Sequence, residues 1–283
     1  MNSYVKHVGV VVSFGILAVV VTLIAGGVWS ALLVVNLTIS PAVPWAVVVM
    51  ALLLWLMWQY LGGRWWPRGT AGARRRALRA KPLAGRTLAW ALVAGLLSIV
   101  ALAGLWFVLF RLANLPATRT LLDSSRYPLP TVLLLLVMAS LVSSVAEEAV
   151  FRGYFQGALE RRISGAAAIA IVAAVMAPEH TLTQGFVWPT LIFYLCVDAM
   201  LGALAYLTGS IVPGVVVHSI GLLTFFTLVW PGDILRQTVG VGSADAWLWI
   251  HLAQATVFAA LALLAFARLS KRTSAARRPL RNQ

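Results

Sequence analysis

Acidic residues are scarce in this sequence, and so is charge altogether. Only 8 Asp and Glu accompany 22 Lys and Arg among 283 residues, and charged residues amount to 11%. A soluble domain is about one quarter charged and about half apolar. Here 61% of the residues are hydrophobic and the mean hydropathy is +0.91. This composition excludes an ordinary soluble domain and indicates an integral membrane protein.

Cysteine is nearly absent as well. The single Cys196 lies inside an apolar run, so an intramolecular disulfide is excluded and a packing role is expected. The net charge of +14 could suggest a nucleic-acid partner. No basic patch is interleaved with aromatic residues on a soluble unit, however, so we expect no nucleic-acid binding and assign the excess charge to cytoplasmic loops.

Long apolar runs are what the sequence does contain. They lack the period-two alternation of barrel strands, so they predict membrane-spanning helices. The run after residue 8 is long for a signal peptide and lacks a cleavage site, so we expect it to be retained. The predicted fold is an all-α integral membrane protein of the cell membrane with about eight spans. The predicted spans are 8–29, 41–61, 88–112, 131–160, 165–180, 188–207, 211–230 and 246–269.

The distribution of Lys and Arg predicts the orientation of these spans. The loop 62–87 holds eight cations and no acid, so it should be cytoplasmic and should attract anionic lipid headgroups. With eight spans, both termini are then cytoplasmic. Within the loop, 69–83 could be a surface-lying amphipathic helix or unstructured. The tail after Ser270 is expected to be unstructured.

Three ionisable groups follow the apolar start of the fourth span: Glu147, Glu148 and Arg152. Each such group costs about 2.5–3.5 kcal/mol at a bilayer centre, which suggests that the protein needs them. On an α-helix Glu148 and Arg152 share a face and can pair. Glu147 points elsewhere without a partner, which suits a general acid or base. The alternative is an ion pair that only orders helix packing.

Two of the four histidines, His180 and His218, lie inside apolar runs. Either alone is commonly just an interhelical hydrogen-bond partner. From the helical rise, Glu147 and His180 both lie about 21–22 Å from the basic side, whereas His218 lies only about 12 Å deep. The spacing therefore favours Glu147 with His180 and only permits His218.

Metal binding is a further alternative for these groups. One Glu and two His form a known catalytic zinc set. The His-Glu-x-x-His helix motif is absent, and no other short ligand spacing occurs. We therefore predict no cofactor. Two alternatives stay open for Glu147, His180 and His218: they hold a divalent metal such as zinc, or they hold a water molecule without a metal.

These residues carry a resemblance. The order Glu-Glu-x-x-x-Arg, a histidine ending the next helix, and Thr-Gly-Ser-Ile-x-Pro-Gly before His218 resembles the CPBP family of CAAX proteases and bacteriocin-processing proteins, also called the Abi family. That family includes the Ras and a-factor converting enzyme. The resemblance covers about 131–226 and implies an intramembrane peptidase with eight or so helices. It also implies that Glu147 activates water, His180 assists, His218 stabilises the oxyanion, and Glu148 and Arg152 support the site.

The sequence departs from the family pattern at two positions. Met176 stands where Phe is expected, and Leu222 stands where Asn or Asp should follow His218. Loss of one oxyanion donor costs about 10²–10³ in rate, unless Ser219 or Thr224 substitutes.

The predicted function is a glutamate-dependent endopeptidase that cleaves a membrane-associated protein or peptide. The spans up to residue 130, a catalytic core at 131–230, and the last span with its tail at 231–283 form its predicted parts. Because of Leu222, the alternative is a weak or inactive scaffold or immunity-type protein. A transporter is a third hypothesis, and the absence of paired Gly/Pro-broken helices disfavours it.

Overall fold

The computed structural model describes residues 3–113, 126–184, 186–229 and 245–277, and every regular element in these ranges is helical. η3 and η4 are π-helices and η1 is a 3₁₀ turn. The elements are α1 Ser3–Ile39, α2 Trp45–Leu61, η1 Arg68–Thr70, α3 Ala71–Leu78, α4 Gly85–Ala113, α5 Leu129–Glu147, η3 Glu148–Phe155, α6 Gln156–Glu160, α7 Gly165–Gln184, α8 Trp188–Thr208, α9 Val212–Thr224, η4 Phe225–Val229 and α11 Ala246–Arg277.

The all-helical membrane fold predicted from composition is confirmed. Within the described ranges, six helical stretches are long and apolar enough to cross a membrane, and two shorter apolar stretches, Trp45–Leu61 and Gly165–Thr181, accompany them. Many Leu, Val and Ile side chains are exposed on these helices, as expected for surfaces that face lipid. The count of eight spans, the side that faces the cytoplasm, and the division into three parts stay predictions.

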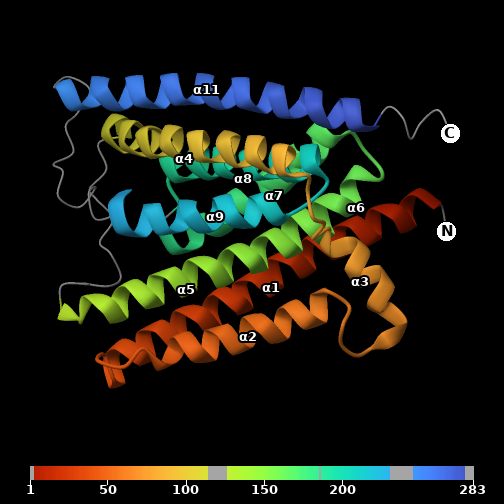
Figure 1. The fold of residues 1–283 in the computed structure, drawn as a ribbon, viewed down its shortest axis with the longest axis horizontal. Coiled ribbons are helices and arrows are strands. Elements are labelled where there is room, and N and C mark those ends of the chain that lie inside the picture. Colours follow the sequence, from red (N-terminus) through yellow and green to blue (C-terminus); the bar gives the residue numbers. More distant parts are fainter. Residues whose placement is uncertain (1–2, 114–125, 185, 230–244, 278–283) are drawn as a thin grey trace.

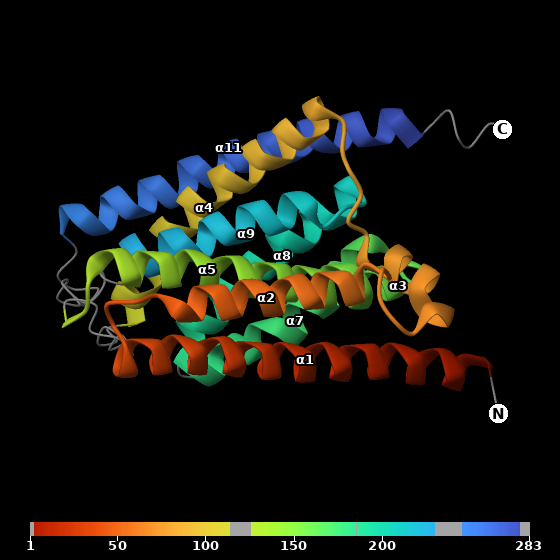
Figure 2. The same cartoon turned by 60° about the horizontal axis from the view of Figure 1, so that its bottom comes forward.

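The helices form one elongated bundle (Figures 1 and 2). The pair α4 and α11 packs along one side of it, and α1 and α2 lie along the other. Helices α5, α7, α8 and α9 lie between these pairs. The start of α1, the end of α11 and the short helix α3 all lie at the same end of the bundle, which we call the basic end. The groups predicted for catalysis come from the central helices.

Two predicted boundaries were wrong. The first span ends at residue 39 instead of 29, and near its end Asn36 bonds to the turn that follows. Its side-chain amide donates to the carbonyls of Ser40 and Val43, and its Oδ1 accepts from the N–H of Ala46 at 2.8 Å. At the other end α11 continues to Arg277, so the tail is helical to that residue.

Candidate active site

Glu147 is the last residue of α5, and its carboxylate is nearly buried without accepting any hydrogen bond. Its Oε2 lies 4.0 Å from Nε2 of His180, on α7, and 3.7 Å from Nε2 of His218, on α9. Three helices that are distant in the sequence thus bring the acid and the two imidazoles predicted for catalysis to one place.

The separations within this cluster set what it can do. At 3.7 and 4.0 Å, Glu147 Oε2 is too far from either imidazole nitrogen for a direct hydrogen bond. Groups at such separations can share one water molecule as a common partner, each at about 2.8 Å. A carboxylate that hydrogen-bonds a water can also accept its proton. The arrangement can therefore orient and activate a water molecule.

His218 is closer to Glu147 than the sequence suggested, and the correction has a structural cause. The depth estimate assumed that the helix carrying His218 begins at the membrane surface. Instead, Ser210 and Ile211 are fully buried beneath the basic loop: the Ser210 hydroxyl donates to the carbonyl of Lys81 at 2.7 Å, and the Ile211 N–H donates to that of Arg79 at 3.2 Å. Helix α9 thus begins beneath the basic loop and not at an exposed surface, so the assumed starting point of the estimate was wrong.

Glu148 orients the imidazole of His218. Its Oε1 lies 3.1 Å from Nδ1 of His218, so Nδ1–H donates to the carboxylate and Nε2 is directed to Glu147. The second oxygen, Oε2, lies against the backbone of α9, where a Cβ built on Gly214 would be only 2.5 Å away. Glycine at 214 is therefore what lets the fully buried Glu148 carboxylate reach this position.

Arg152 is fully buried and contacts two carboxylates. The predicted pair with Glu148 is present but loose, with Nε 3.6 Å from Oε1. A closer partner is Asp198 on α8, whose Oδ1 accepts from an Arg152 terminal nitrogen at 2.7 Å, and the Met176 sulfur is a further neighbour. The segment Glu148–Phe155 is a π-helix, a form that is frequent at functional sites and was not foreseen.

Asp198 and Tyr194, both on α8, are site residues that the sequence reasoning missed. Asp198 could have been flagged, because an acid inside an apolar run is a functional candidate by default. Tyr194 carried no such signal. Its ring stacks on the imidazole of His180, with centroids 4.2 Å apart and planes at 19°, and also meets Phe193 edge-on.

Position 222 keeps its significance in the structure. Leu222 is half-buried on α9, one turn beyond His218. Of the two proposed substitutes for the expected donor, Ser219 already uses its hydroxyl proton, because Oγ donates to the Val215 carbonyl at 2.8 Å. The Leu222 side chain itself supplies no hydrogen-bond donor at this point of α9.

Within the described ranges, no group of three or more His, Cys, Asp or Glu side chains is arranged to hold a metal ion. The prediction about cofactors stays a prediction, and Glu147, His180 and His218 stay the residues to which it applies.

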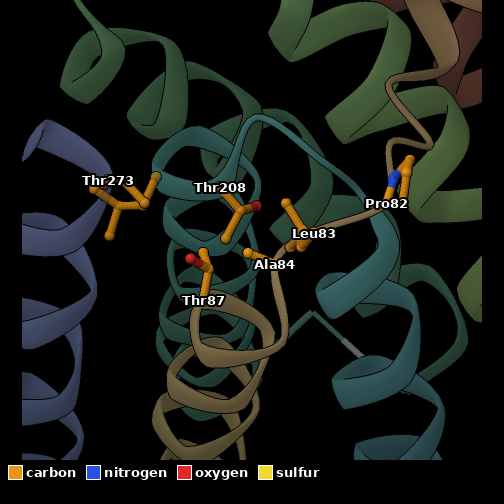
Figure 3. A pocket seen from close by; sticks show the side chains of 7 residues that line it. Pro82, Leu83, Ala84, Thr87, Thr208 and Thr273 are labelled. Carbon is orange, nitrogen blue, oxygen red and sulfur yellow. The ribbon is translucent and has the colours of Figure 1, made fainter. Parts of the chain in front are cut away.

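A separate cavity of about 240 Å³ opens between the start of α4 and the ends of α8 and α11 (Figure 3). It is lined by Pro82, Leu83, Ala84, Thr87, Leu207, Thr208 and Thr273. No charged side chain lines it, and the hydroxyls of Thr208 and Thr273 donate to carbonyls of their own helices. The cavity shares no residue with the acid and imidazole cluster and adds nothing to its chemistry.

Comparison with known proteins bears on this cluster. Residues 129–223 match the family model described as type II CAAX prenyl endopeptidase Rce1-like. The chain matches no curated protein and no solved structure. The matched segment runs from the start of α5 into α9, so it contains both imidazoles and every acid of the cluster. The resemblance predicted from the sequence motifs is confirmed.

Proposed function

We propose, from the premise that residues 129–223 belong to the Rce1-like family of CAAX proteases, that the chain is an intramembrane endopeptidase. Membership of this family and a multi-pass membrane fold together indicate a protease with a peptide or protein substrate. We propose the cell membrane as its location and a membrane-associated protein or peptide as its substrate.

The proposed reaction is hydrolysis by a water molecule that Glu147 deprotonates. The water oxygen attacks the carbonyl carbon of the scissile bond, and its proton passes to the Glu147 carboxylate. His180 holds the same water through Nε2. The proton on Glu147 then passes to the amine nitrogen as the carbon–nitrogen bond breaks, which restores the carboxylate and balances the step.

His218 is proposed to stabilise the oxyanion. Its Nδ1–H donates to Glu148, and a proton on Nε2 gives the imidazolium form, which can donate to the developing negative oxygen. The charge of that form is offset by the Glu148 carboxylate, 3.1 Å from Nδ1, and by the Glu147 carboxylate, 3.7 Å from Nε2, until Glu147 accepts the water proton. Arg152 and Asp198 support this role by fixing Glu148.

One observation carries the proposal: Glu147 is a nearly buried carboxylate without a hydrogen-bond partner, and two imidazole nitrogens lie within 4.0 Å of it. A buried carboxylate left in this state destabilises a fold, so it is expected where chemistry requires it. Arg152 and Asp198, in contrast, contact each other directly at 2.7 Å, although Nε of Arg152 and Oδ2 of Asp198 also lack a hydrogen-bond partner.

The test is Glu147→Gln, measured as peptide cleavage by the purified protein in lipid, with and without a chelator and with metal content determined. Loss of the general base should lower the rate at least about 10²–10⁴-fold. Glu160→Gln is the matched control, because Glu160 pairs with Arg79 at the basic end and touches none of the cluster. Cleavage at the wild-type rate by the Glu147 variant, at equal expression, would refute the proposal.

A second candidate function is favoured by Leu222, which removes an expected oxyanion donor. The chain would then be a weakly active or inactive scaffold, of the bacteriocin-immunity type, that keeps the fold. Leu222→Asn separates the two candidates. A weak enzyme should gain cleavage rate, up to about 10²–10³-fold, whereas an inactive scaffold should show no gain.

A further inference from the structure

The basic loop 62–87 has a folded part that is organised around one arginine. Arg74, on α3, is 6% exposed although seven other cations share its loop. Its Nε donates to the carbonyl of Tyr60 at 2.8 Å, and its terminal nitrogens donate to the carbonyls of Trp65 and Pro67 and to the hydroxyl of Thr70. The guanidinium also lies over the Tyr60 ring, 4.5 Å from its centroid. One side chain thus satisfies the carbonyls of the turn that follows α2.

The side chains displayed by this turn are of two kinds. Trp65 is 51% exposed and Trp66 is 77% exposed. The exposed cations of the loop are Arg64, Arg68, Arg75, Arg76, Lys81 and Arg86. The loop contains no acid that could neutralise them.

This surface is attached to the bundle where the membrane span α2 ends. The Tyr154 hydroxyl lies 3.3 Å from the carbonyl of Leu61 and 3.4 Å from that of Arg74. Helix α3 also packs closely against Gly153, where an added Cβ would lie 3.0 Å from the carbonyl oxygen of Leu78. The surface lies at the basic end, the end of the bundle where α1 starts and α11 finishes (Figures 1 and 2). Its position relative to α2 is therefore fixed.

We propose that Trp65, Trp66 and the exposed cations form a docking surface for anionic phospholipid headgroups of the membrane that the chain spans. Tryptophan is enriched at the membrane–water interface, and a cation near an anionic membrane surface contributes about 1 kcal/mol. An acidic protein segment is the alternative occupant. Headgroups are favoured because both tryptophans follow the apolar helix α2, a predicted span, within five residues, and because Arg74 bonds to the carbonyl of Trp65. The proposal does not depend on peptidase activity.

The first experiment removes exposed charge. Arg75→Gln with Arg76→Gln is compared with Lys271→Gln with Arg272→Gln, a matched pair of exposed cations at the same end of the bundle on α11. Native mass spectrometry of the full chain measures the preference for phosphatidylglycerol over phosphatidylcholine. The α3 pair should lower that preference about fivefold for each cation removed, and the α11 pair should change it much less. Equal losses would mean that net charge alone attracts the lipid, and would overturn the proposal.

The second experiment keeps the charge and removes the organising contacts. Arg74→Lys cannot make the same set of hydrogen bonds, because an ammonium has three donors on a flexible stem and no planar fork. It should lose most of the preference for phosphatidylglycerol, while Arg76→Lys, the same change at an exposed position, should keep it. An unchanged preference in Arg74→Lys would refute the organising role. If the glutamine variants instead lost affinity for an oligo-glutamate peptide and kept their lipid preference, the occupant would be a protein segment and the headgroup proposal would fail.

Discussion

Replacing Gly214 by alanine is expected to impair the candidate site through a single added methyl group. Gly214 lies in the first turn of α9, one helix turn before His218. A Cβ at this position would lie 2.5 Å from Glu148 Oε2 and 3.2 Å from its Cδ. Glu148 cannot simply turn away, because its other oxygen accepts from His218 Nδ1 and contacts Arg152. The carboxylate and the imidazole must therefore shift together.

The size of the effect follows from the overlap. Ordinary contact begins at 3.4 Å, so the carboxylate must move by about 0.9 Å. Overpacking of this kind costs about 1–3 kcal/mol, and the better helix propensity of alanine returns up to about 1 kcal/mol. Stability should thus fall only modestly. A displacement of about 1 Å in a catalytic constellation can cost about 10²-fold in rate, so activity should fall far more than stability.

The matched control is Gly221→Ala on the same helix. There a Cβ would lie 3.6 Å from Ile99, an ordinary contact, so the substitution should preserve the rate and keep or slightly raise the melting temperature. Both variants are assayed by cleavage rate and by thermal unfolding in lipid. If Gly214→Ala cleaves as fast as Gly221→Ala, the Glu148–His218 contact does not matter for the reaction and the proposed orientation of His218 is wrong.

Two further predictions concern residues that only the structure revealed. Asp198→Ala removes the closest carboxylate of the fully buried Arg152 and leaves the loose Glu148 contact as its one ion pair, beside the Met176 sulfur and the backbone carbonyl of residue 198. The free energy of unfolding should fall by about 3–5 kcal/mol, and a loss under about 1 kcal/mol would argue against a structural ion pair. Tyr194→Leu removes the ring stacked on His180 and should lower kcat about three- to tenfold with little change in KM, whereas Tyr194→Phe should retain the rate. Phe193→Leu removes the neighbouring ring instead, and an equal loss of kcat there would show that general packing, not the stack, is responsible.

Much of the fold could be predicted because the membrane leaves few options. Apolar runs of about 20 residues in lipid must be helices, since only helices satisfy their own backbone groups. The span boundaries were less predictable where polar side chains bond to the backbone. Asn36 resembles a helix-ending signal, yet its three hydrogen bonds to the following turn make it part of the connection between α1 and α2.

The candidate site was predictable in membership but not in its contacts. Glu147, His180 and His218 are conspicuous because ionisable groups in apolar runs are rare. The spacing of residues along an α-helix could not show that Arg152 bonds more closely to Asp198 than to Glu148. The segment Glu148–Phe155 is a π-helix, so its side chains do not follow the α-helical spacing that the sequence argument assumed. Periodicity in a sequence describes the faces of a single helix, whereas the contact between Arg152 and Asp198 joins two helices.

The sequence by itself determined that this chain is a membrane-embedded helical bundle and which acid and imidazoles merit attention, because the cost of burying charge in lipid is a property of residue type. Only the tertiary structure decided that His218 lies beside Glu147. Its depth depends on where the turn at Ser210 is buried under the carbonyls of Arg79 and Lys81, more than 120 residues away in the chain. Such a contact is set by the packing of whole helices, and no local pattern encodes it.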